Sequence, residues 1–354
     1  MKKLIVTVGP SSIEENCLSN LKKAGADIFR INLSHSNEEL LDFYISRLKD
    51  ANLPLSIDTQ GPQLRISEFK LEKNIQVGSK ILLVFGKDNT NIIDSNNYIL
   101  FNHPEAFNQI NKGDILRIDF GGMAIRCGAV LKDNIYMSNL ISCGSITINR
   151  AVDIVDKTLK LNILTSFDKY AISYAYSNGC RKVFASFVSS ARDVREIKEY
   201  LPHDCELVSK IETINGIKNI EEIISISNQI LIDRGDLSRE TSISMVPFAT
   251  KHIIEKCKKK SVPVYIATNV LDSMIVNSMP SRAEVSDIFN LLNSSVSGLV
   301  LAAEVAIGNN PVKSVALLRH LMSTYEKYEN DFLNAKKLQK PPKELIGEEL
   351  FNWI

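Results

Sequence analysis

The chain has 354 residues, and its 42 basic side chains nearly balance its 41 acidic ones, which gives a formal net charge of +1. This balance argues against a basic surface for nucleic acid, so we expect no nucleic-acid partner. The sequence is 44% hydrophobic and 23% charged, as in ordinary globular proteins. No segment approaches the roughly 20 consecutive apolar residues of a membrane span, so we expect no membrane partner. The length suggests two domains, although barrel folds often reach this size as one unit.

The cysteines and the first residues bear on the cellular compartment. Six cysteines are scattered without a Cys-x-x-Cys pair or a histidine at zinc spacing, which is typical of reduced thiols in a cytoplasmic protein. After Lys3 the chain runs directly into Leu4–Val8, an apolar segment too short for a cleavable signal peptide. We therefore expect a cytoplasmic location.

Short apolar, β-branched segments alternate with segments of helical periodicity along most of the chain. The eight segments predicted as strands are Leu4–Val8, Ile28–Leu33, Leu55–Thr59, Lys182–Phe187, Glu206–Ile211, Gln229–Ile232, Val262–Ala267 and Gly298–Leu301. The predicted helices include Glu14–Lys23, Glu38–Lys49, Phe167–Ser177, Ala191–Tyr200, Phe248–Lys259 and Val312–Tyr325. Alternating strands and helices form parallel sheets, and eight units fit a closed (β/α)8 TIM barrel better than an open sheet.

About ninety residues interrupt this alternation after the third strand. They contain turn signals and short strand-like runs at Ile81–Phe85, Ile115–Ile118, Asn134–Met137 and Ile146–Ile148. A loop of that length without its own structure is unusual, so we predict an inserted small β-barrel domain. The predicted domains are a discontinuous barrel at 1–61 and 156–330, an inserted lid at 62–155 and a charged C-terminal tail at 331–354, which we expect to be a linker or mobile extension.

Charged and polar side chains follow the predicted strands, where the active site of a (β/α)8 barrel lies. These strand ends read Arg30-Ile31-Asn32-Leu33-Ser34-His35, Asp58-Thr59, Lys210-Ile211-Glu212, Asp233-Arg234-Gly235-Asp236, Thr268 and Glu304. Glu212 and Asp236 offer the oxygen ligands that Mg2+ prefers, and Arg30 and Lys210 would bind an anion close to the metal. The pattern is typical of phosphoryl transfer, where positioning and charge neutralisation dominate. A single pair, such as Lys210 with Glu212, is equally compatible with a structural ion pair.

The motifs at these strand ends resemble those of the pyruvate kinase family. In family order they are Thr7–Ser12, Arg30–His35, Asp58–Arg65, Ala185–Phe187, Ser209–Glu212, Arg234–Leu237, Ala267-Thr268, Ser281–Glu284 and Gly308–Pro311. The match covers residues 1 to about 325 and is weakest within the insert. Because several motifs recur in the same order, the resemblance is specific.

The resemblance implies roles for the matching residues. Lys210 and Arg30 would be catalytic and face the phosphoryl group of phosphoenolpyruvate, while Thr268 with a bound water would protonate the enolate. The other implied roles are substrate binding by Gly235, Asp236, Thr268 and Ser186; nucleotide binding by Arg30, Asn32, His35 and Arg65; Mg2+ (or Mn2+) binding by Glu212 and Asp236; and binding of K+, as an optional second cation, by Asn32, Ser34, Asp58 and Thr59.

The sequence also departs from the family pattern. Gln60 and Gln63 replace a usual lysine and glutamate, and the loss of the glutamate puts a K+ requirement in doubt. Ala302–Gly308 replaces the family's Ser-Gly-Glu-Thr-Ala-Lys-Gly, which removes a hydroxyl from the expected proton relay and a lysine from the nucleotide side. The family normally adds a C-terminal regulatory domain, whereas this chain ends at Ile354, so we expect no allosteric domain and leave open whether a homo-oligomer forms.

These observations favour a Mg2+-dependent transferase of the pyruvate kinase type, an ATP-binding glycolytic kinase. It would move a phosphoryl group from phosphoenolpyruvate to ADP, or to another nucleoside diphosphate, and give pyruvate and ATP. One alternative is enolate or lyase chemistry on a pyruvate-like or phosphorylated acid without nucleotide, which the missing nucleotide-side groups would permit. The other alternative is a non-catalytic regulator that binds phosphoenolpyruvate.

Overall fold

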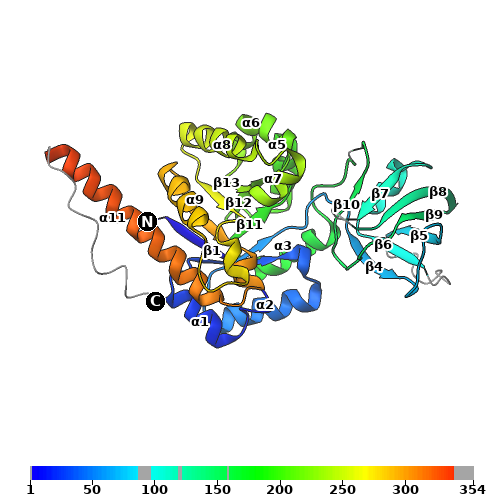
Figure 1. Cartoon of the computed structure of the whole chain (residues 1–354), viewed down its shortest axis with the longest axis horizontal. Helices are drawn as coiled ribbons and strands as arrows, with labels where there is room; N and C mark the ends of the chain where they lie inside the picture. The colour runs from blue at the N-terminus through cyan, green and yellow to red at the C-terminus, as the bar shows by residue number, and fades with distance from the viewer. Residues whose placement is uncertain (1, 87–96, 119–121, 158, 339–354) are drawn as a thin grey trace.

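Eight parallel strands form a closed barrel in a computed structural model of the chain, which describes residues 2–86, 97–118, 122–157 and 159–338 (Figure 1). Around the barrel the strand order is β1-β15-β14-β13-β12-β11-β3-β2. The strands are β1 (Lys3–Val8), β2 (Ile28–Asn32), β3 (Leu55–Asp58), β11 (Lys182–Ala185), β12 (Glu206–Ile211), β13 (Gln229–Asp233), β14 (Val264–Ala267) and β15 (Gly298–Leu301). This confirms the predicted TIM barrel, with each predicted strand in place.

Helices cover the outside of the barrel and follow the strands. The longer ones are α1 (Glu15–Lys23), α2 (Glu38–Asp50), α3 (Ser166–Ser177), α4 (Ala191–Tyr200), α8 (Val246–Lys260), α9 (Arg282–Asn293) and α11 (Pro311–Leu338); the short ones are α5 (Ile214–Lys218), α6 (Ile220–Ile226), α7 (Arg234–Glu240) and α10 (Ala303–Ala306). Reciprocal capping boxes begin three of them, at Thr165, Ser190 and Ser281. Helix α11 continues to Leu338, beyond the helix end predicted at Tyr325. Residues 339–354 lie outside the described part of the chain.

Two apolar layers hold the barrel together. Side chains inside it, among them Ile5, Phe184, Val208, Leu231 and Val300, form one buried cluster. A larger cluster fills the space between the strands and the surrounding helices. Since apolar residues fill the middle of the barrel, polar side chains gather where the strands end.

The inserted segment forms a separate seven-stranded sheet with the order β10-β7-β8-β9-β5-β6-β4. Its strands are β4 (Ile66–Lys70), β5 (Lys80–Phe85), β6 (Tyr98–Phe101), β7 (Ile115–Ile118), β8 (Ala124–Lys132), β9 (Ile135–Ser142) and β10 (Val152–Ile154). A bridge between Arg65 and Ala151 joins the sheet's two edges, which curls the sheet around its own apolar core. The strand predicted over Ile146–Ile148 is absent, because the chain turns there and Asn149 adopts a positive φ of 66°.

Hydrogen bonds join the insert to both segments that connect it to the barrel. The ring of His103, which is only 2% exposed, contacts Gly61 O at 3.3 Å through Nε2 and Glu105 Oε1 at 2.9 Å through Nδ1. Glu105 Oε1 also accepts a hydrogen bond from Asn162 N at 3.0 Å. The buried carboxylate of Asp168, on α3, accepts hydrogen bonds from Gln60 N and Gly61 N. The two connecting segments are therefore fixed to each other at the junction.

Glu105→Gln is expected to lower the free energy of unfolding by about 1–2 kcal/mol at pH 7. Burial alone would raise the pKa of Glu105, but the hydrogen bonds from His103 and Asn162 outweigh it and lower the pKa from 4.5 to about 2. The stabilisation is present above pH 4.5 and is lost as the pH falls towards 2. The measurement is urea unfolding of both proteins at pH 7 and pH 3. The exposed Glu199→Gln is the control, and an equal loss at both pH values would contradict the prediction.

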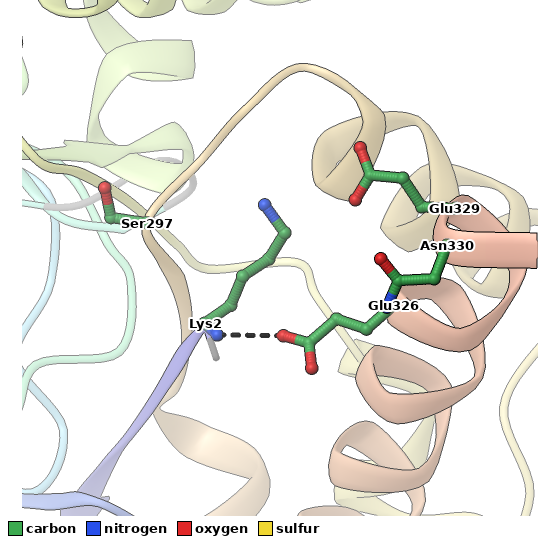
Figure 2. Close-up of a pocket in the computed structure, with 5 residues that line it drawn as sticks. All are labelled: Lys2, Ser297, Glu326, Glu329 and Asn330. Carbon is green, nitrogen blue, oxygen red and sulfur yellow. Dashed lines mark hydrogen bonds between the residues drawn. The ribbon is translucent and has the colours of Figure 1, made fainter. Parts of the chain in front are cut away.

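The amino ends of the strands carry a different set of polar residues. There Lys2 N donates to Glu326 Oε1 at 3.0 Å, which joins the start of the chain to α11. Lys2, Ser297, Glu326, Glu329 and Asn330 line a hollow of about 530 Å3 (Figure 2). Among the described residues, no helix is both long and apolar enough to cross a membrane.

Candidate active site at the carboxyl ends of the barrel strands

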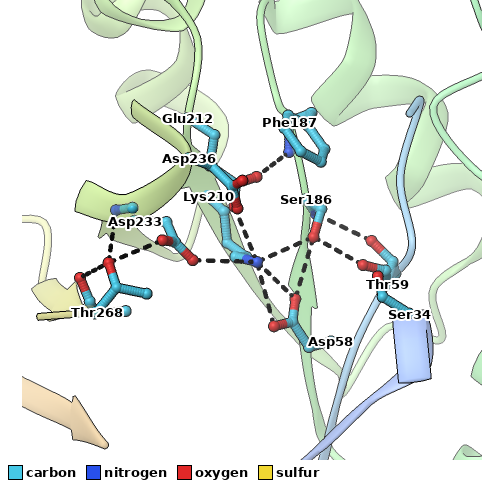
Figure 3. A network of polar contacts seen from close by, with 12 residues as sticks. Ser34, Asp58, Thr59, Ser186, Phe187, Lys210, Glu212, Asp233, Asp236 and Thr268 are labelled. Carbon is cyan, nitrogen blue, oxygen red and sulfur yellow. Dashed lines mark hydrogen bonds and ion pairs between the residues drawn. The ribbon is translucent and has the colours of Figure 1, made fainter. Parts of the chain in front are cut away.

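Lys210 lies at the centre of a buried polar network at the carboxyl ends of the strands (Figure 3). Its Nζ lies 3.1 Å from Asp58 Oδ1, 3.0 Å from Glu212 Oε1 and 3.7 Å from Asp233 Oδ2. It also donates to Ser186 Oγ at 3.1 Å. Burial alone would lower the pKa of Lys210, but the three carboxylates outweigh it, so its pKa lies above the ordinary value. Lys210 is therefore a fixed positive charge.

Arg30 provides a second buried cation beside Lys210. Its Nη1 lies 2.9 Å from Asp58 Oδ2, and its Nε and Nη2 both donate to Thr7 Oγ1. The guanidinium also lies over the ring of Phe184, 5.4 Å from the centroid. Asp58 therefore bridges Arg30 and Lys210 and holds two cations at one place, as binding of an anionic group requires.

Glu212 and Asp236 bring negative charge to the same place. Glu212 is fully buried, and its Oε2 accepts a hydrogen bond from Phe187 N at 2.5 Å. Burial raises the pKa of Glu212, and the carboxylates of Asp236, Asp233 and Asp58 add to the effect against the opposing charge of Lys210. Burial and then Asp233 raise the pKa of Asp236. A further cation at this place would stabilise the ionised forms of these carboxylates.

The loop after β14 places Thr268 at this site in a strained conformation. Thr268 and Asn269 have φ values of 64° and 52°, which β-branched residues in particular avoid. Arg234 holds the loop through Thr268 O and Asn269 O. Thr268 Oγ1 accepts a hydrogen bond from Gly235 N at 2.7 Å. As a donor, the same hydroxyl has two acceptors in reach, Asp233 Oδ1 at 3.0 Å and Ala267 O at 2.6 Å. Strain of this kind is common where a side chain has a chemical role.

The residues expected to bind K+ lie along the end of β2 and β3, and their polar groups already make local contacts. Asn32 Oδ1 accepts from Ser34 N at 2.9 Å, because the chain leaves β2 in a short 3-10 helix at Leu33–His35 and not in an extended strand. Thr59 Oγ1 accepts from Ser186 N, and Thr59 O accepts from Ser186 Oγ at 2.7 Å. Ser186 therefore fixes the end of β3 and contacts Lys210 at the same time.

The residues expected to bind nucleotide are divided between the barrel and the insert: Arg30 and Asn32 lie on β2, His35 follows it, and Arg65 lies at the edge of the insert. Arg65 Nη1 donates to Asn149 O, while its buried Nε has no hydrogen-bond partner among the described residues. Partial burial, and then the nearby charge of Arg65, lower the pKa of His35.

Near β15 the Ile307 side chain is 60% exposed. The side chain of Glu304, by contrast, is buried and accepts hydrogen bonds from Leu271 N and Ala302 N. This strand-end carboxylate therefore holds the backbone of the adjacent loops in place.

The structure brings together Arg30, Asp58, Lys210, Glu212, Asp236 and Thr268 at the strand ends and places Asp233 with them. Asp168 contacts the backbone of Gln60 and Gly61 just after β3. Neither aspartate had a predicted role. Asp233 could have been assigned from its place at the end of β13. Asp168 could not, because its partners Gln60 and Gly61 lie more than 100 residues away in sequence.

The cluster offers a donor set that fits a divalent cation. One carboxylate oxygen from each of Glu212, Asp233 and Asp236 lies within 4.8 Å of the others. Glu212 Oε1 is buried and, although close to Lys210, accepts no hydrogen bond with good geometry from any described residue. Oxygen donors at this spacing suit hard cations such as Mg2+ or Mn2+.

The fold and the site together define the class of protein. The architecture is that of a TIM-barrel enzyme, with buried cations, clustered carboxylates and a strained loop at the carboxyl ends of the barrel strands. Residues 1–315 match the family model for the pyruvate kinase barrel domain. Relatives named pyruvate kinase include those of Candida albicans (28% identical, 96% of this chain, 70% of the relative), Sporosarcina psychrophila (30%, 92% and 57%) and Agrobacterium vitis (30%, 93% and 69%). The chain belongs to the pyruvate kinase family and spans between about half and about two thirds of its relatives' length.

Proposed function

We propose that the protein transfers a phosphoryl group from phosphoenolpyruvate to ADP or another nucleoside diphosphate, with a divalent cation bound at the barrel mouth. The observation that carries the proposal is the position of Lys210 between Asp58 and Glu212, with Arg30 on the other side of Asp58. Two buried cations suit a transferring phosphoryl group, and the carboxylates beside them suit the cation. The relatives named pyruvate kinase support the same reaction.

The protein's own groups divide the work of this reaction. Arg30 and Lys210 bind the phosphoryl oxygens, and Lys210 stabilises the negative charge left on the enolate oxygen. The amides of Gly235 and Asp236 and the hydroxyl of Thr268 bind the substrate carboxylate, with Thr268 also passing a proton to the enolate carbon through water. Ser186 orients Lys210. Glu212 and Asp236 hold the divalent cation, which supplies charge neutralisation when bound.

The insert, residues 62–155, serves as a lid in this proposal. Arg65 at its edge, with His35 and Asn32, binds the nucleotide phosphates. Burial lowers the pKa of Arg65 while the nearby charges of Asp236, Glu212 and Asp58 oppose this lowering, which supports a position of Arg65 near the carboxylates. K+ binding at Asn32, Ser34, Asp58 and Thr59 is the optional part of the proposal, because Gln63 replaces the charged glutamate usual in the family.

The exposed Ile307 favours one second candidate. An apolar residue on the side where the nucleotide would bind offers no charge to its phosphates, so enolate chemistry on a phosphorylated or pyruvate-like acid without nucleotide would use the same cations and carboxylates. This reaction needs Lys210 and Glu212 but not Arg65.

The test is pyruvate formation from phosphoenolpyruvate with Mg2+ or Mn2+, with each of several nucleoside diphosphates, and with or without K+. We expect pyruvate to form only when a diphosphate is present. Nucleotide-independent turnover would favour the second candidate. No turnover with any diphosphate, together with stabilisation by phosphoenolpyruvate alone in a thermal melt, would overturn the kinase proposal in favour of a binding protein.

A further inference from the structure

Asp233 has a conformation that its position in the chain does not require. It occupies the N-cap position of α7, where an aspartate ordinarily accepts a hydrogen bond from the helix's first amides. Its side chain makes no such bond. It is instead 5% exposed and turned towards the carboxyl ends of the barrel strands, where Oδ1 meets Thr268 Oγ1 at 3.0 Å and Oδ2 lies 3.7 Å from Lys210 Nζ (Figure 3).

The charges around Asp233 leave it short of a counter-ion. Arg30 pairs with Asp58 at 2.9 Å, so the ammonium of Lys210 is shared between Asp58, Glu212 and Asp233. The two positive charges of Arg30 and Lys210 therefore face three carboxylates, and a buried carboxylate without sufficient counter-charge is costly. The two carboxylates whose oxygens lie within 4.8 Å of Asp233, those of Glu212 and Asp236, are the ones proposed above to hold the divalent cation.

We propose that Asp233 is a third protein carboxylate of the divalent-cation site, next to Glu212 and Asp236. The proposal rests on the proposed function only for the presence of a cation at this place. Its geometric basis is the set of three ligand oxygens within 4.8 Å, together with the buried Glu212 Oε1 that accepts no hydrogen bond from a described residue. Three carboxylates allow the protein to bind the cation before substrate arrives, since an octahedral ion then takes half its ligands from the chain.

The test measures Mn2+ binding to the whole protein without phosphoenolpyruvate or nucleotide, by isothermal titration calorimetry. Asp233→Asn keeps the shape of the side chain and removes its charge. We expect this variant to bind Mn2+ at least tenfold more weakly than the unchanged protein.

Thr268→Ala is the matched control, because it removes the hydrogen bond between Thr268 and Asp233 but leaves the carboxylate. We expect its Mn2+ affinity to stay within about twofold of the unchanged protein. Equal affinity of Asp233→Asn and the unchanged protein would overturn the proposal. An equal loss in Thr268→Ala and Asp233→Asn would also overturn it, because Asp233 would then act only through the loop.

A second measurement does not depend on a variant. The number of water molecules on bound Mn2+, from water-proton relaxation, should be three if each carboxylate supplies one oxygen, and a value of four or more would contradict the proposal. If the unchanged protein binds no Mn2+, both this inference and the cation in the proposed function fail. If it binds Mn2+ but Asp233→Asn binds equally well, only the inference fails.

Discussion

Lys210→Met is expected to abolish turnover and, in the protein without divalent cation, to lower the free energy of unfolding by about 3–5 kcal/mol. Lys210 is 5% exposed and shared by Asp58, Glu212 and Asp233, so its removal leaves buried carboxylates without their main counter-charge. Loss of a group that stabilises developing charge costs about 10²–10³-fold or more in rate. The measurements are pyruvate formation and urea unfolding with and without Mg2+.

Lys182→Met is a matched control for this prediction. Lys182 also lies in a barrel strand and pairs with a carboxylate, Glu206 Oε2 at 2.6 Å, but that partner is half exposed. Exposed pairs contribute about 0–1 kcal/mol, so this variant should keep both activity and stability. If Lys210→Met unfolds at the same denaturant concentration as the unchanged protein in the absence of Mg2+, the carboxylates do not depend on Lys210 for their charge balance.

Glu212→Gln is expected to have the opposite effect on stability and the same effect on activity. Burial raises the pKa of Glu212, which means that its charged form is disfavoured in the folded protein, so the neutral amide should leave the metal-free protein as stable or more stable. The variant lacks a carboxylate for the divalent cation, so turnover should fall by about 10³-fold or more. In a thermal melt, Mn2+ should stabilise the unchanged protein but not Glu212→Gln.

The contrast between these two variants is the informative result. A purely structural ion pair between Lys210 and Glu212 would make both substitutions destabilising, whereas a cation site makes only the loss of the lysine destabilising. A marked loss of stability in metal-free Glu212→Gln would therefore contradict the assignment of Glu212 to the cation. Glu206→Gln, in the exposed pair with Lys182, provides the control.

Much of the barrel could be predicted because its signal is local. The period of two along Lys210-Ile211-Glu212 places both charged side chains on the inner face, and the structure has both there, buried. The same signal was less accurate at the end of β2, where the strand was predicted to continue to Leu33 but ends at Asn32. The side chain of Asn32 instead accepts a hydrogen bond from Ser34 N and begins a 3-10 helix, an outcome that alternation alone does not predict.

The strand that was predicted over Ile146–Ile148 and is absent shows the limit of β-branched composition as a signal. Three β-branched residues there satisfy local propensity, but their neighbours Asn149 and Arg150 bond back to the start of β4. Propensity for strand depends on packing partners as much as on the residues themselves, so tertiary contacts decided the outcome. The helix predicted to end at Tyr325 instead runs to Leu338, since helical conformation continues into a charged stretch.

The near balance of 42 basic and 41 acidic residues is a property of the sequence alone, and so are the alternation of strands and helices and the charged strand ends. These follow from composition and from side-chain periods of two and 3.6, which need no knowledge of distant residues. The tertiary structure alone decided which charges meet. Asp58 meets Lys210 across 152 positions, and Asp233 turns from its own helix to Thr268, because parallel strand pairing brings the ends of strands that are distant in sequence to one edge of the barrel.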